Sequence, residues 1–239
     1  MTHGKAPISR RNFLRTAVAA AVTPSIVGRS PSWSRAAAKP ALDPAAVLRD
    51  LMEGNARFKS GQTTAPRRQP SDFAAVAEGQ SPEAVIVGCS DSRVPPEIVF
   101  DQGVGDLFVV RVAGNVVSGT GVIVKGSIEY AVAELNVPLI MVLGHSGCGA
   151  VKAALKHIES SDKLPGAIRG LVDMIRPVAA RVKGQPGDPL ENAIRANVVA
   201  SVDRLKGLPP ILAPAVKGGS LRVVGAVYDL RSGSVSQVI

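Results

Sequence analysis

Two short segments of this chain bring together residue types that bind metals. The first, Cys89-Ser-Asp91-Ser-Arg93, supplies a thiol, a carboxylate and a guanidinium, and the second, His145-Ser-Gly-Cys148, supplies an imidazole and another thiol. Two thiolates and one imidazole form a zinc ligand set, and with only three such ligands a fourth tetrahedral position stays available for water or for Asp91. Because a structural zinc site uses four protein ligands permanently, the pattern indicates catalytic zinc.

The elements around these segments predict where they meet. Cys89 follows the continuous apolar run 84–88 and His145 follows the run 139–144, and such runs are expected of parallel strands buried on both faces. Sites in open parallel sheets form beyond the carboxyl ends of the strands, where the strand order reverses. If these two strands are neighbours, the segments meet there. Cys148 then lies at the start of the next helix, where the partial positive charge favours a thiolate.

The chain after about residue 39 predicts one α/β domain, since about 200 residues suffice for one sizeable core. Its apolar runs alternate with segments of helical spacing, which indicates a mainly parallel sheet of four strands plus an antiparallel edge strand, flanked by helices. The strands are expected at 84–88, 107–111, 139–144 and 221–228, with the antiparallel strand at 235–238. The helices are expected at 44–58, 73–77, 121–135, 150–158, 167–181 and 190–205.

The N-terminus has the features of an export signal. The hexapeptide SRRNFL at positions 9–14 has the twin-arginine form, a mildly apolar stretch follows at 16–27, and the alanines at 36–38 offer a small-x-small cleavage site. We expect residues 1–38 to be a twin-arginine signal peptide and residues 39–239 to be the mature, periplasmic domain. The alternative is a disordered basic tail. The apolar stretch is too short for a membrane span, so no stable membrane anchor is expected after signal removal.

The positive charge of the chain is concentrated in the same N-terminal segment. The formal net charge is +9, and residues 1–38 hold six basic residues and no acidic one, which leaves 22 basic and 19 acidic residues in the remainder. A remainder with so small a net charge and few aromatic side chains gives little support to nucleic-acid binding. We therefore expect no nucleic-acid partner.

Two cysteines in an exported protein could instead form a disulfide. Against this, Cys89 and Cys148 lie beside Asp91 and His145 in Gly-rich turns, and a zinc-bound thiolate is less available for oxidation. Because the twin-arginine route carries folded proteins, zinc could occupy both thiols before export. A non-catalytic zinc or redox module remains the alternative from a different class of protein.

At these residues the chain resembles the β-class carbonic anhydrases, whose pattern is Cys-x-Asp-x-Arg followed further along by His-x-x-Cys. The resemblance covers about residues 43–239 and includes the segments 105–111, 126–132 and 144–149. It implies that residues 39–239 form a β-carbonic-anhydrase-like catalytic domain. The implied reaction is the reversible hydration of carbon dioxide to bicarbonate and a proton by zinc-bound hydroxide, with one Zn²⁺ per chain.

The resemblance also implies roles for individual residues. Cys89, His145 and Cys148 would ligate the zinc ion. Asp91 would accept a hydrogen bond from the hydroxide while Arg93 holds it off the metal by a bidentate ion pair, and it would become a fourth zinc ligand if that pair breaks.

Further residues would bind the substrate, and a partner subunit would complete the site. The implied substrate-binding residues are Gln80, Phe108, Tyr130 and the backbone of Gly149. Because Phe108 and Tyr130 would come from the partner subunit, a homodimer is the minimum expected assembly, and a tetramer is the alternative. On the same fold, a hydrolase of carbonyl sulfide or carbon disulfide remains an alternative function.

Overall fold

The structure is a computed structural model that describes residues 42–117, 121–158 and 164–239. The expected signal peptide at 1–38 lies outside these residues. Within the described ranges, no helix is both long enough and apolar enough to cross a membrane.

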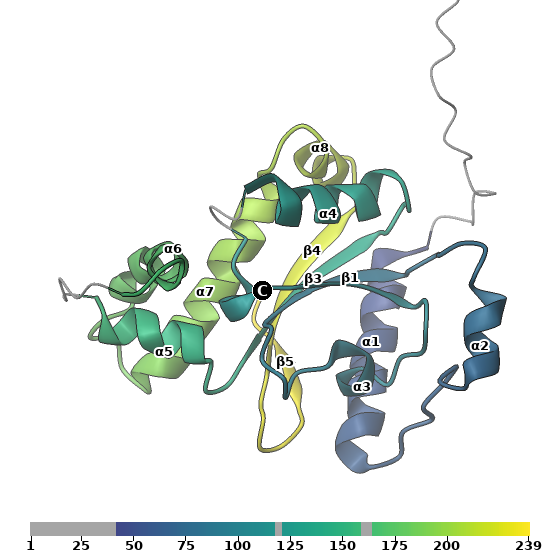
Figure 1. Cartoon of the computed structure of the whole chain (residues 1–239), viewed down its shortest axis with the longest axis horizontal. Coiled ribbons are helices and arrows are strands. Elements are labelled where there is room, and N and C mark those ends of the chain that lie inside the picture. Colours follow the sequence, from purple (N-terminus) through teal and green to yellow (C-terminus); the bar gives the residue numbers. More distant parts are fainter. Residues whose placement is uncertain (1–41, 118–120, 159–163) are drawn as a thin grey trace, which may run out of the picture. The chain divides into compact units, whose positions relative to one another are not determined.

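A five-stranded sheet forms the centre of the domain (Figure 1). The strands follow the order β2-β1-β3-β4-β5, in which the first four are parallel and β5 runs antiparallel to β4. This confirms the predicted sheet of four parallel strands with an antiparallel edge strand. The strands are β1 (Ala84–Gly88), β2 (Leu107–Arg111), β3 (Leu139–His145), β4 (Arg222–Tyr228) and β5 (Val235–Gln237).

Helices cover both faces of the sheet, as Figure 1 shows. Alternate side chains of each strand face opposite ways, so Val85 and Val87 join one apolar core while Ala84 and Ile86 join the other. One face carries α1 (Pro44–Ser60) and α3 (Pro96–Val99). The other carries α4 (Gly121–Ala133), α5 (Gly149–Lys156), α6 (Ile168–Arg181), α7 (Pro189–Lys206) and α8 (Leu212–Lys217).

The expected helices are present; one of them begins earlier than expected, and two short α-helices and one 3₁₀ turn are additional. The short helix expected at 73–77 is α2 (Pro70–Ala75), which begins earlier because Pro70 occupies its first turn. The helices α3 and α8 were not predicted, and neither was the 3₁₀ turn η1 (Ala113–Asn115). Helices of four and six residues are too short to show the apolar spacing by which a helix is recognised in a sequence.

Helix α7 packs closely against the strands that carry the candidate site. Asp188 caps its N-terminus, and the carboxylate accepts hydrogen bonds from the N–H groups of Leu190 and Glu191. A Cβ atom at Gly144 in β3 would lie 2.6 Å from a methyl carbon of Val198 in α7. Glycine is therefore required beside His145, because a larger residue would push α7 away from the carboxyl end of β3.

Candidate metal centre

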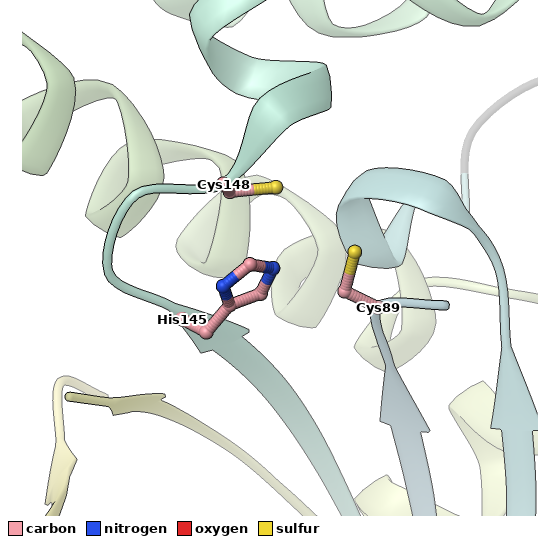
Figure 2. Close-up of side chains that lie close together, drawn as sticks. All are labelled: Cys89, His145 and Cys148. Carbon is pink, nitrogen blue, oxygen red and sulfur yellow. The ribbon is translucent and has the colours of Figure 1, made fainter. Parts of the chain in front are cut away.

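Three metal-binding side chains meet at the carboxyl end of the sheet. Cys89 follows β1, His145 is the last residue of β3, and Cys148 immediately precedes α5. Because β1 and β3 are adjacent, the potential ligand atoms of these residues all lie within 4.8 Å of one another. Figure 2 shows the three side chains pointing toward a common centre. The predicted meeting of the two segments between adjacent strands is confirmed.

The imidazole of His145 is oriented to bind a metal through Nε2. The residue is fully buried, and its Nδ1–H donates to the backbone oxygen of Ser146 at 3.0 Å. This bond leaves the lone pair on Nε2, which has no hydrogen-bond partner in the described part of the chain. A buried nitrogen without a partner costs free energy, and two thiols lie beside it, so the donor set fits a zinc ion.

The two thiols ionise unequally. The Cys148 thiol donates toward the sulfur of Cys89 and lowers the pKa of Cys89, with further lowering by His145 and by the N–H of Gly114. The same interaction raises the pKa of Cys148, and burial raises it further. Zinc binds thiolates, so any proton that the two thiols hold without metal must leave when the ion binds.

A turn in the backbone donates a hydrogen bond directly to one sulfur. The N–H of Gly114 lies 3.2 Å from Sγ of Cys89. Gly114 has φ of 72°, and a Cβ atom there would lie 2.8 Å from Cδ1 of Ile175. Both the left-handed backbone and the close packing require glycine at this position.

Asp91 and Arg93 form the predicted bidentate ion pair. Arg93 Nε donates to Oδ1 of Asp91 at 2.9 Å, and one Arg93 terminal nitrogen donates to Oδ2 at 2.7 Å. These bonds hold the pKa of Asp91 below its usual range. Oδ2 of Asp91 lies 3.9 Å from Nε2 of His145, which places the carboxylate at the edge of the metal centre. The described arrangement is the one in which Arg93 holds Asp91.

Arg111 supports the loop that carries Cys89 and Asp91, a role that sequence reasoning missed. Its Nε donates to the backbone oxygen of Cys89 at 2.8 Å, and a terminal nitrogen donates to the backbone oxygen of Asp91. The signal was a guanidinium at the end of an apolar strand, where it reaches the same sheet edge as the ligands.

A cleft of about 690 Å³ opens beside the Asp91–Arg93 pair. It adjoins Arg93 of this pair and the turn between His145 and Cys148. Its walls are Arg93, Ser146, Gly147, Asp188, Leu190, Glu191, Tyr228, Asp229, Leu230 and Arg231.

Of the expected substrate-binding residues, only Gly149 adjoins the metal centre of its own chain. Gly149 follows Cys148 and begins α5. Gln80 is exposed in the loop before β1, at the opposite end of that strand from Cys89. Phe108 pairs in register with Val85 near the amino end of β1, and its ring centroid lies 6.4 Å from that of Tyr130.

Comparisons with known proteins point to one family. The family model described as carbonic anhydrase matches residues 84–235. Carbonic anhydrase 2 of Mycobacterium tuberculosis is 42% identical over 194 residues, which is 81% of this chain and 92% of that protein. The carbonic anhydrase of Mycolicibacterium smegmatis is 39% identical over 82% of this chain and 94% of its own length. A structure of tetrameric β-carbonic anhydrases from Sordaria macrospora superposes with a TM-score of 0.63 at 29% identity, covering 81% of this chain and 94% of that one.

Proposed function

The chain belongs to the β-class carbonic anhydrase family, and we infer that it is a lyase that catalyses the reversible hydration of carbon dioxide to bicarbonate and a proton. The observation that carries this function is the buried group of Cys89, His145 and Cys148, in which Nε2 of His145 has no hydrogen-bond partner among the residues that the structure describes. Three ligands leave one position of a tetrahedral zinc site open, which favours an enzyme over a non-catalytic zinc module.

Cys89, His145 and Cys148 would hold one zinc ion. When bound, zinc lowers the pKa of a coordinated water and so supplies a hydroxide nucleophile near neutral pH. Hydrogen bonds within the chain preorganise the metal ligands. The bond from Nδ1 of His145 to Ser146 orients Nε2, and the N–H of Gly114 draws electron density from the sulfur of Cys89.

Asp91 and Arg93 are the proposed catalytic pair. Asp91 is ionised and lies at the edge of the metal centre, where its carboxylate would accept a hydrogen bond from a water at the metal and orient it. Arg93 holds both carboxylate oxygens and keeps them off the metal. If the pair opened, Asp91 would be free to act as a fourth ligand to a bound zinc ion in place of water.

Zinc content and competing substrates test the function. Purified protein should contain one zinc per chain and hydrate carbon dioxide. Release of hydrogen sulfide from carbonyl sulfide or carbon disulfide, measured in parallel, tests the alternative hydrolase. Faster sulfide release than carbon dioxide hydration would overturn the proposed substrate, and a metal-free protein with a Cys89–Cys148 disulfide would overturn the enzyme.

Anion binding tests the Asp91–Arg93 pair. Arg93→Ala should free Asp91 to bind the metal, whereas Asp91→Ala should leave the fourth position open but the water poorly oriented. Both should keep their zinc and lose about 10²- to 10⁴-fold in kcat. A small anion such as azide should bind the Asp91 variant readily and the Arg93 variant poorly. Equal anion binding by the two metallated variants would contradict the proposal that Arg93 keeps Asp91 off the metal.

A second copy of the chain is the proposed partner. Helix α4 exposes Val122 and Ile123, whose side chains are 82% and 80% accessible, and Tyr130 lies further along the same helix. Apolar side chains this exposed indicate a surface that another subunit covers. A homodimer formed here, or a tetramer, would bring Phe108 and Tyr130 of one subunit toward the metal centre of the other. Val122→Asp should yield monomers in light scattering; an unchanged oligomer would exclude this surface.

Export by the twin-arginine route to the periplasm is proposed from the sequence SRRNFL at 9–14. Replacing Arg10 and Arg11 together by Lys should leave the protein in the cytoplasm, because the paired arginines identify the signal. Cell fractionation measures this outcome. Undiminished periplasmic delivery of the double variant would contradict the export signal without affecting the enzyme.

A further inference from the structure

Helix α7 carries two polar side chains on a face that is otherwise apolar. Asn197 and Ser201 are one helical turn apart and only 4% and 5% exposed, and the buried residues around them include Ile194, Val198 and Val202. Burying an amide is costly unless it is hydrogen-bonded. These two side chains therefore need partners across the core.

Both side chains donate to the same backbone turn. Nδ2 of Asn197 lies 2.8 Å from the backbone oxygen of Gly114, and the hydroxyl of Ser201 lies 3.5 Å from the backbone oxygen of Asn115. The first distance is that of a well-formed hydrogen bond and the second is at the long limit, so Asn197 makes the stronger contact. The turn they hold is η1.

The turn needs this support at Asn115, because a left-handed backbone has a cost for a residue with a side chain that it does not have for Gly114. Gly114 and Asn115 both have positive φ, of 72° and 46°. The side-chain amide nitrogen of Asn115 is buried and has no partner within the described residues. Backbone in sparsely populated regions persists only where surrounding contacts enforce it. Asn197 supplies such a contact on the carbonyl side of Gly114.

The N–H side of Gly114 points into the metal centre. It donates to Sγ of Cys89 at 3.2 Å, so one glycine connects the amide of Asn197 to a metal-binding sulfur. An N–H hydrogen bond to a thiolate withdraws electron density from the sulfur. Two thiolates neutralise the charge of a zinc ion, so any such withdrawal preserves the metal's ability to acidify water.

We propose that Asn197 is a positioning residue of the metal centre, which acts by clamping Gly114 so that its N–H stays directed at the sulfur of Cys89. This role rests on the proposed zinc enzyme. Asn197 touches neither metal nor substrate. Its effect passes through one backbone residue, and its removal weakens the hydrogen bond to Cys89 without removing a ligand.

Cobalt substitution and zinc competition test this role in the full-length protein. Asn197→Ala is compared with Asn192→Ala, because Asn192 is also an amide on α7 and donates to a backbone oxygen outside η1, that of Pro186 at 3.0 Å. The sulfur-to-cobalt charge-transfer band should move to lower energy in Asn197→Ala only. Zinc affinity, measured against a chromophoric chelator, should fall about 10- to 100-fold, as for other residues that act through a ligand.

Asn197→Asp is the second variant, because it keeps the side-chain volume but replaces the donor with an acceptor. It should shift the band in the same direction even if Asn197→Ala fails to fold. An unmoved band and unchanged zinc affinity in Asn197→Asp, with only a lower melting temperature, would overturn the positioning role. Wild-type protein that binds neither cobalt nor zinc would instead overturn the proposed function, so the two failures are distinguishable.

Discussion

Two buried polar regions of this molecule differ in how many hydrogen-bond partners the chain provides for their polar atoms. At the metal centre, Nε2 of His145 is fully buried and has no hydrogen-bond partner within the described ranges of the chain. In the Asp101 cluster, the carboxylate of Asp101 is equally buried, but it accepts hydrogen bonds from Nε of Arg57, from the N–H and hydroxyl of Thr64, and from the N–H of Ala65, at 2.8 to 2.9 Å. Arg57 belongs to α1, so these bonds join a helix and a loop to the end of α3.

The comparison separates a structural use of buried polarity from a functional one. Buried polar groups are nearly always hydrogen-bonded. A group whose partners all lie within the chain has no free donor or acceptor with which to bind a ligand. Burial raises the pKa of Asp101, but Arg57 and the N–H groups outweigh burial and hold that pKa below its usual range. The incomplete set at His145 is what marks a ligand site. Changes in the two regions should therefore affect different measurements.

Replacing a metal ligand should give the largest effect, and it should affect metal content far more than stability. In Cys148→Ser the hydroxyl is a much poorer zinc ligand than a thiolate, so most of the zinc and the hydration activity should be lost. The loss of affinity should exceed the 10- to 100-fold that is typical of residues behind a ligand. Metal analysis after dialysis measures it, with Ser90→Ala, an exposed neighbour of Cys89, as the control. Full zinc occupancy in Cys148→Ser would break the assignment.

Removing the carboxylate of the other region should do the reverse. Asp101→Ala leaves the N–H groups of Thr64 and Ala65 and the guanidinium of Arg57 without their partner. The free energy of unfolding should fall by about 2 to 4 kcal/mol, because several charged hydrogen bonds are lost together. Zinc per folded chain should not change. Denaturant unfolding measures the loss, and Asp50→Ala, an exposed acid of α1, should stay within about 0.5 kcal/mol of wild type. Zinc loss in folded Asp101→Ala would contradict a purely structural role for the Asp101 cluster.

The pH dependence of stability gives the smallest and most specific effect. Because the folded-state pKa of Asp101 lies below its unfolded value, its contribution is fully present above about pH 4 and is lost as the pH falls through the folded value. The stability difference between wild type and Asp101→Asn should therefore be constant from pH 7 to 5 and shrink at lower pH. Zinc release in acid affects both proteins alike and cancels in the difference. A gap that widens in acid would contradict this sign.

The sequence alone was sufficient to predict the three metal-binding residues and the succession of the strands and the longer helices along the chain. Strand and helix patterns arise from local apolar spacing and capping, as with Pro44 after Asp43, and these are visible in neighbouring residues. The ligands could be predicted because few residue types bind zinc and because each ligand lies at or just after the end of a buried strand. The short helices α3 and α8 lacked enough residues to show a period.

What surrounds the ligands was decided by the tertiary structure. Arg111 and Gly114 contact Cys89 from 22 and 25 positions further along the chain. Asn197 acts through Gly114, from which it is separated by another 83 positions. No local sequence pattern reveals contacts between residues so far apart. Asn197 could be seen only as a polar residue within an apolar helical face. Its partner depends on how closely α7 packs against the sheet. The identity of the ligands thus follows from side-chain chemistry, which is written residue by residue. The hydrogen bonds that tune them depend on a packing geometry that exists only once the helices have closed over the strands.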